Sequence, residues 1–158
     1  MRLRIRTATV ADVRDMHRLR KRVRENRLSD TTRIKEASYL PYIAAASAWV
    51  AEADGRISGF AAIDGPAKSV WALFVDPDVE RRGIGQALHF KMVDWARQQG
   101  IDRLSLSTEE GSRAVQFYHR SGWKVIGTRP GGEVIFARSI NTLGPTDRRP
   151  TNWVLFDS

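Results

Sequence analysis

The sequence contains no cysteine. A disulfide scaffold, a thiolate nucleophile, a cysteine-ligated zinc site and an iron–sulfur cluster are therefore excluded. No stretch approaches the roughly 18 consecutive apolar residues that a membrane-spanning helix needs. Residues 1–6 alternate charged and bulky side chains, which is not the pattern of a secretory signal. We therefore expect a soluble, cytoplasmic protein without a membrane partner.

Positive charge is unevenly distributed along the 158 residues. The formal net charge is +8, of which +7 falls in residues 1–40 and +1 in residues 41–158. A basic segment fits an anionic ligand, a nucleic acid or plain solubility. With 42% hydrophobic and 28% charged residues, the chain has enough apolar material for a core, so global disorder is excluded.

Hydrophobic periodicity predicts alternating strands and helices, which is typical of an α/β or α+β domain. Strands are expected at residues 3–7, 48–53, 56–64, 69–75, 103–108, 123–128 and 133–137. Helices are expected at 10–24, 32–46, 83–99 and 112–121, the second of them broken near Pro41. Asp54-Gly55 predicts a type I′ hairpin turn, and Thr9 with Asp12 predicts a helix start. Residues 139–158 indicate a loop that ends in a last strand or a partner-facing segment at 152–156.

The helix expected at residues 10–24 places one arginine among its apolar positions. Val13, Met16, Leu19 and Val23 share one arc, and Arg20 falls within it. Two interpretations stay open. The Arg20 stem can lie beside the core with its charged end in water, or the side chain can turn toward a cleft.

A buried strand, a charged loop and a helix that begins with Gly83 and Gly85 form the most informative stretch of the sequence. Free N–H groups at a helix start and two preceding arginines suit a phosphate. A dinucleotide fingerprint is the first competitor, with Glu109 as the ribose acid. Leu88 replaces its third glycine and the loop before Gly83 is too long, which argues against that fold.

Two motifs resemble the GNAT family of N-acetyltransferases. Residues 80–85, Glu-Arg-Arg-Gly-Ile-Gly, resemble the acetyl-CoA signature of the family, and residues 114–123 resemble its later helix, A-x-x-F-Y followed by glycine and an aromatic. The resemblance implies a single N-acetyltransferase domain over residues 1–158, with its core at 3–138 and an extension at 139–158 that could add a strand. Its expected fold is a mostly antiparallel mixed sheet of about seven strands with about four helices.

By resemblance, acetyl-CoA lies in a V between the strands at 70–75 and 103–108. Its pantetheine would pair with the strand backbone, its pyrophosphate would sit on the N–H groups of residues 82–87, and the Val75 N–H would face the oxyanion. The implied acetyl-CoA contacts are Leu73, Phe74, Val75, Arg81, Arg82, Gly83, Ile84, Gly85, Gln86, Ala87, Ser112, Arg113 and Phe117. The sequence departs from the family at Glu80, in place of Arg or Gln, and at Gly111, where Asn is frequent.

The implied reaction is direct attack of a neutral primary amine on the thioester, with Tyr118 as the general acid at sulfur. The general base stays open among Asp76, Glu109, Glu110, Glu25, Glu52 and a chain of water molecules. The three histidines, His17, His89 and His119, show no metal spacing and are expected at exposed helix positions, so no metal is expected.

The acceptor is expected to be a small-molecule or peptide amine. Its contacts are expected from the first helix, the loop after it and the end of the strand at 103–108: Arg20, Glu25, Asn26 and Glu109. A homodimer is compatible with the sequence. Two alternatives remain: a non-catalytic acetyl-CoA-binding regulatory module, and a nucleic-acid binder that uses the basic first helix. The second is disfavoured because aromatic residues do not interleave with the basic run.

Overall fold

The computed structural model describes residues 2–24, 34–79, 83–141 and 154–156. Within these residues one sheet holds eight strands: β1 (Leu3–Thr7), β2 (Ala48–Ala53), β3 (Arg56–Asp64), β4 (Ser69–Val75), β5 (Arg103–Glu109), β6 (Lys124–Thr128), β7 (Glu133–Ser139) and β8 (Val154–Phe156). The helices are α1 (Val13–Arg24), α2 (Leu40–Ala44), α3 (Ile84–Gln98) and α4 (Arg113–Arg120). Single 3₁₀ turns are η1 (Val10–Asp12), η2 (Glu36–Tyr39) and η3 (Pro77–Val79).

The sheet is mixed but mostly antiparallel. Its order is β6-β7-β5-β4-β3-β2-β1-β8, and among the described pairings only β4–β5 and β1–β8 are parallel. This confirms the expected fold class, with one strand more than the seven expected. The additional strand, β8, lies beside β1 at the end of the sheet.

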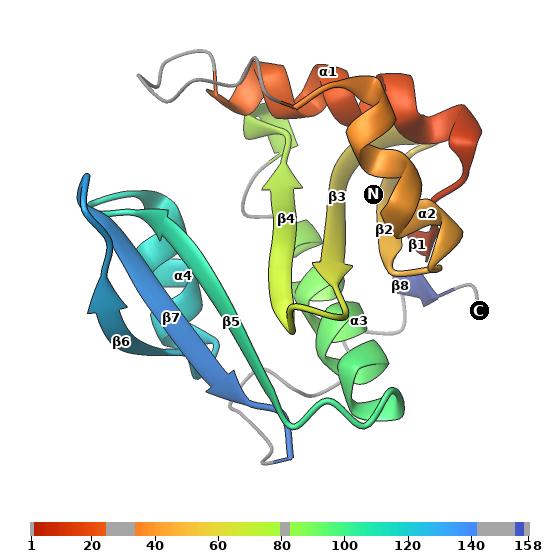
Figure 1. Ribbon diagram of the computed structural model, residues 1–158. Coiled ribbons are helices and arrows are strands. Elements are labelled where there is room, and N and C mark those ends of the chain that lie inside the picture. Colours follow the sequence, from red (N-terminus) through yellow and green to blue (C-terminus); the bar gives the residue numbers. More distant parts are fainter. Residues whose placement is uncertain (1, 25–33, 80–82, 142–153, 157–158) are drawn as a thin grey trace.

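Two apolar cores lie on the two faces of the sheet. Figure 1 shows α1 and α2 on one face of β1–β4, with α3 on the other. On the first face, Met16 and Leu19 of α1 pack with Tyr39 and Phe60. On the second face, α3 contributes to a larger core that extends to α4 and β7. Burial of these apolar faces supplies most of the driving force for folding.

Most predicted boundaries agree with the structure within two residues, because the signals that set them are local. Asp54 and Gly55 have φ angles of 51° and 82°, as a type I′ turn requires. The Asp12 carboxylate accepts the backbone N–H of Thr9 at 2.8 Å, which confirms the predicted helix start.

The helix predicted at 32–46 is wrong in extent. Its described part is the η2 turn followed by the five-residue α2. Pro41 does not break α2 but stands in its first turn, where a missing N–H removes no helical hydrogen bond. Residues 32 and 33 lie outside the described residues.

A glycine on β3 allows α3 to lie close to the sheet. A Cβ atom added at Gly59 would lie 3.0 Å from Ile84 Cγ2, Leu88 Cδ1 and the Phe74 carbonyl oxygen. These distances are tighter than nearly all real Cβ contacts, so a side chain here would push α3 or β4 outward by a few tenths of an ångström. Gly59 therefore positions the start of α3 against β4, next to the region that the sequence predicts as the site.

Candidate functional site

β4 and β5 meet at one end and then separate. Their parallel ladder consists of the single pair Ser69↔Ser105, and the Ser105 N–H donates to the Lys68 carbonyl at 3.1 Å. Beyond this pair the two strands diverge toward their carboxyl ends (Figure 1). The backbone of β4 that faces β5 over this stretch has no ladder partner on β5. This is the V that the resemblance implied.

A bulge at Trp71 decides which backbone groups face the V. Ala72 pairs with Ala62 and Val70 with Ile63, so Trp71 is the extra residue of β4. Two hydrogen bonds agree with this insertion. In a regular strand, residues separated by an even number direct their backbone groups to the same side. Lys68 and Asp76 are eight residues apart, yet the Lys68 carbonyl faces β5, whereas the Asp76 N–H faces β3 and donates to the Ser58 carbonyl at 2.8 Å.

The direction of each later residue follows from the alternation of backbone groups along a strand. Leu73 and Val75 present their N–H and carbonyl groups to the V, as expected. Phe74 lies two residues before Asp76, so its backbone groups face β3 as those of Asp76 do. Its ring packs on the face of the sheet that α1 covers. The backbone of Phe74 therefore does not face the V as expected, because consecutive strand residues alternate and the bulge sets which of them face β3.

The start of α3 presents three backbone donors. Gly83 precedes the helix with φ 83°, a left-handed conformation that favours glycine. The first closed helical bond runs from the Ala87 N–H to the Gly83 carbonyl at 3.0 Å. The N–H groups of Ile84, Gly85 and Gln86 precede that bond and have no intrahelical partner. The Ala87 N–H is used in this helical bond, so it is not one of the free donors that the sequence predicted for the pyrophosphate. Arg81 and Arg82 lie outside the described residues.

Three separately predicted parts meet at Gly85. A Cβ atom at Gly85 would lie 3.5 Å from Phe117 Cε1 on α4 and 3.6 Å from Val75 Cγ2 at the end of β4. The anion-binding start of α3, the open end of β4 and the later motif on α4 therefore form one place. At the start of α4, Ser112 lies with its Oγ 3.5 Å from Thr108 Oγ1, and Arg113 is exposed.

Tyr118 follows Phe117 and is 6% exposed. Its ring packs against Phe117, Trp123 and Phe136, with centroid distances of 5.4, 5.4 and 5.9 Å. Burial raises the pKa of the Tyr118 hydroxyl well above its usual value near 10, because a phenolate would lose its hydration. Tyr118 is thus a neutral phenol at physiological pH, which can donate a proton but not accept one.

The expectation that all three histidines are exposed is wrong for His89. His89 on α3 is fully buried, and its Nε2 accepts the Trp123 indole N–H at 2.9 Å. It is buried because α3 packs against both the sheet and the α4 region, and its ring lies 5.8 Å from that of Phe117. His17 is half-buried, with Nδ1 3.0 Å from the Tyr39 hydroxyl, and His119 is exposed. No group of three metal-ligating side chains occurs within the described residues.

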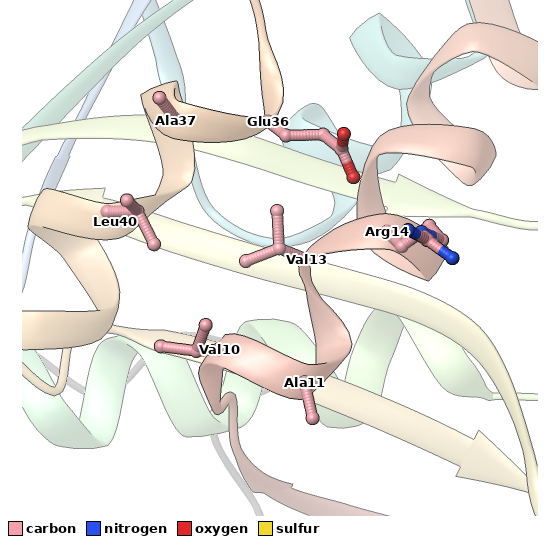
Figure 2. Close-up of a pocket in the computed structure, with 7 residues that line it drawn as sticks. All are labelled: Val10, Ala11, Val13, Arg14, Glu36, Ala37 and Leu40. Carbon is pink, nitrogen blue, oxygen red and sulfur yellow. The ribbon is translucent and has the colours of Figure 1, made fainter.

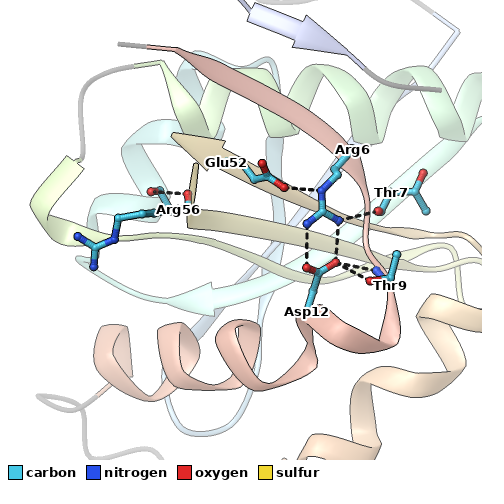
Figure 3. Close-up of polar contacts among 7 residues, drawn as sticks. Arg6, Thr7, Thr9, Asp12, Glu52 and Arg56 are labelled. Atoms are coloured by element: carbon cyan, nitrogen blue, oxygen red, sulfur yellow. Dashed lines mark hydrogen bonds and ion pairs between the residues drawn. The ribbon is translucent and has the colours of Figure 1, made fainter. Parts of the chain in front are cut away.

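Two of the candidate general bases already have cationic partners. The Asp76 carboxylate accepts the Asp78 N–H at 2.9 Å and pairs with Arg22 at 3.2 Å. Glu52 pairs with the Arg6 Nε at 2.5 Å, and Arg6 also holds Asp12 through two hydrogen bonds of 2.8 Å (Figure 3). Glu52 therefore belongs to a network that joins β1, β2 and η1.

The remaining acidic candidates lie at the far end of β5 or beyond the described residues. Glu109 ends β5 opposite Glu133, and Glu110 is exposed in the turn that follows. Glu25, together with the acceptor candidate Asn26, lies outside the described residues.

Arg20, the other acceptor candidate, is buried on α1 at 7% exposure. Its guanidinium carbon lies 4.5 Å from the centroid of the Trp71 ring and 5.0 Å from that of Phe74. Of the two interpretations left open, the one with the charged end in water is wrong. The side chain turns toward β4 at its bulge.

A separate hollow of about 480 Å³ lies between the η1–α1 segment and the η2–α2 segment. Figure 2 shows its lining, which includes Val13, Arg14 and Leu40. Its lining contains none of the predicted site residues, and it lies at the amino-terminal end of α1. It is therefore distinct from the V.

Known proteins agree with this arrangement. Residues 11–123 match the family described as the acetyltransferase (GNAT) family. Mycothiol acetyltransferase of Clavibacter sepedonicus is 36% identical over 76 residues, which are 46% of this chain and 25% of that protein. The peptidyl-lysine N-acetyltransferase YiaC of Escherichia coli is 32% identical over 85 residues, 54% of this chain and 55% of that protein. This chain thus spans about a quarter of the first relative and about half of the second.

The fold matches solved structures over most of its length. The PaiA N-acetyltransferase of Thermoplasma acidophilum, solved with coenzyme A, superimposes with a TM-score of 0.73 at 19% identity, covering 88% of this chain and 99% of that chain. No helix in the described part of this chain has the length and hydropathy to span a membrane. Because the family match covers well over half of the sequence and includes both motifs around Gly85, this chain belongs to the GNAT acetyltransferase family.

Proposed function

We propose that this chain transfers an acetyl group from acetyl-CoA to a primary amine, carried by a small molecule or a peptide. The observation that carries the proposal is the convergence at Gly85 of an open strand end, a helix start whose first N–H groups have no intrahelical partner, and the α4 motif, in a chain of the GNAT family. We take the whole chain, residues 1–158, as one acetyltransferase domain. The relatives that act on different acceptors support the reaction and leave the acceptor open.

Acetyl-CoA would be held mainly by backbone groups. The N–H groups of Ile84, Gly85 and Gln86 suit the pyrophosphate, since a helix start combines free donors with a partial positive charge. Leu73 and Val75 offer strand-like donors and acceptors for the pantetheine. Backbone donors do not depend on side-chain identity, so Glu80 in the signature is compatible with binding. Ser112, Arg113 and Phe117 would contact the same molecule from α4.

The chemistry requires a proton donor at sulfur and a donor at the oxyanion. The amine nitrogen forms a bond to the acetyl carbon, the carbon–sulfur bond breaks, and the Tyr118 hydroxyl donates to the sulfur as negative charge develops on it, regaining any transferred proton from solvent. The backbone N–H of Val75 would stabilise the oxyanion that forms on the way. The nitrogen releases its extra proton to a base or to water. Burial of Tyr118 keeps the phenol protonated, as this role requires.

The experiment that tests this proposal combines binding and turnover. We expect calorimetry to show micromolar binding of acetyl-CoA and of CoA but no response to NADH. We expect release of CoA with at least one member of a panel of primary amines. Tyr118→Phe should lower kcat by about 100-fold or more, the range of general acid catalysis, with the affinity for acetyl-CoA unchanged.

The two results have separate meanings. Binding of acetyl-CoA without turnover on any amine would instead indicate a non-catalytic acetyl-CoA-binding module. Turnover that is equal in wild type and Tyr118→Phe would remove Tyr118 from the mechanism and leave the ring only its packing role.

A further inference from the structure

Arg20 is a buried cation that lacks a counter-ion among the described residues. It lies on the inner face of α1, with its guanidinium beside the rings of Trp71, Phe74 and Tyr39. Its Nη1 is fully buried and has no hydrogen-bond partner in the described part of the chain. A buried donor without a partner is unfavourable, and more so when it carries a charge.

The surrounding aromatic rings only partly compensate this charge. Ring faces attract a guanidinium, but they do not accept the planar hydrogen bonds of its N–H groups. The nearby hydroxyl of Tyr39 interacts with the Arg20 side chain and also lies 3.0 Å from His17 Nδ1, but it leaves Nη1 without a partner among the described residues. Burial raises the pKa of this hydroxyl, and the hydrogen bond from Arg20 and its charge oppose the rise without reversing it, so Tyr39 stays a neutral phenol rather than a counter-ion.

The position of Arg20 connects it to the proposed reaction. Trp71, whose ring contacts the guanidinium, is the bulged residue of β4 and precedes Leu73 and Val75. Phe74, the second ring, stands between those two residues and projects to the α1 face. Arg20 therefore lies over the strand segment whose backbone faces the V, on the side of the sheet opposite α3.

The flat aromatic surroundings of Arg20 favour a carboxylate. A guanidinium and a carboxylate form two parallel hydrogen bonds in one plane, which needs little room between flat rings. Tyr42 stacks on Trp71 at a centroid distance of 4.4 Å and an interplanar angle of 25°, and so extends the flat surface. A tetrahedral phosphate would place oxygens out of that plane.

We propose that Arg20 is the counter-ion for a carboxylate of the acceptor, and hence that the substrate is a small amino acid carrying both a primary amine and a carboxylate. This inference rests on the proposed acetyl transfer for the role of the amine, but not for the binding of the anion. Arg20 would become fully hydrogen-bonded only in the complex.

Calorimetry with matched ligand pairs tests the inference. The probes are glycine, β-alanine and 4-aminobutyrate, each against its carboxamide, with and without CoA. In the wild type we expect at least one carboxylate to bind roughly 10- to 100-fold more tightly than its carboxamide, the range of a charged hydrogen-bond pair. Arg20→Met should reduce this ratio to about one, and Arg20→Lys should restore part of it. Arg18→Met, an exposed position on the same helix, should leave the ratio unchanged.

Each result decides the matter. Equal binding of carboxylates and carboxamides by the wild type, or a ratio that survives in Arg20→Met, would overturn the inference. A stronger response to aminomethylphosphonate than to the carboxylates would overturn the choice of anion. An Arg20-dependent ratio without any response to CoA would support the anion site and overturn acetyl transfer. CoA binding without an Arg20-dependent ratio would support the acetyl-CoA site and overturn the anion site at Arg20.

Discussion

Arg6 on β1 and Arg20 on α1 are two guanidinium groups held between the sheet and the first helix, and their surroundings differ. Arg6 donates to both oxygens of Asp12, to Glu52 and to the Thr7 carbonyl (Figure 3). Arg20 lies among aromatic rings, and its Nη1 has no partner within the described residues. The first group ties three elements together, whereas the second brings an unused charge to the edge of the candidate site.

The comparison separates a structural cation from a functional one. A partly buried charge with good hydrogen bonds stabilises its surroundings, and removal of either partner leaves the other buried and unpaired. A buried charge without a partner stabilises nothing comparable, so its retention is best explained by a ligand. Replacing each arginine by methionine, which keeps much of the volume and removes the charge, is therefore expected to cost much stability at Arg6 and little at Arg20.

The largest effect is expected at Arg6. Arg6→Met should lower the free energy of unfolding by about 3 kcal/mol, because Asp12 and Glu52 would lose their shared cation. Urea unfolding at pH 7, followed by circular dichroism, measures this difference. Arg18→Met is the matched control, since Arg18 pairs with Asp15 in an exposed position, and it should change stability by less than about 0.5 kcal/mol. Equal losses at both positions would contradict the structural role of the Arg6 network.

The same network should respond to acid. Burial raises the pKa of Asp12, but the hydrogen bonds from Arg6 and Thr9 more than reverse this and hold the pKa below its usual value. A lowered native pKa stabilises the fold above the unfolded value of about 4 and loses this contribution as pH falls through the native value. Asp12→Asn should therefore cost about 2 kcal/mol at pH 7.

The difference in stability between wild type and Asp12→Asn should shrink below pH 4. The other carboxylates titrate in both proteins, so their contributions cancel in the difference. Unfolding curves collected from pH 7 down to the lowest pH at which both proteins fold would measure it. A difference that stays constant over this range would show that the Asp12 charge is not what stabilises the network.

The sequence allowed the fold to be predicted wherever the determining physics is local. The positive φ angles of Asp54 and Gly55 set the hairpin, and Gly83 and Gly100 bracket the third helix. The bulge at Trp71 could not be predicted, because it depends on the register between β3 and β4. That single inserted residue decides that Leu73 and Val75, and not Phe74, face the V.

The candidate site was predictable in its motifs but not in its contacts. The family resemblance indicated Gly85 and Phe117, which the structure brings together. Helical periodicity placed Arg20 on the apolar face of its helix, but whether it finds a counter-ion depends on the elements packed above it. His89 was missed for a related reason: a helix that packs against two neighbours buries a wider face than one apolar arc suggests.

The smallest expected effect on stability is the one that most sharpens the comparison. Arg20→Met removes a cation without a counter-ion and leaves an apolar side chain among apolar rings. The substitution therefore has one destabilising and one stabilising effect on the fold. The loss of the attraction between the cation and the rings is worth about 1 to 2 kcal/mol in a buried setting, and the relief of the unpaired donor is of similar size. We therefore expect the urea unfolding free energy to stay within about 1 kcal/mol of the wild type. A loss as large as that of Arg6→Met would show that Arg20 supports the fold as Arg6 does, and an unchanged stability together with lost carboxylate binding would identify a charge that the fold holds for its ligand.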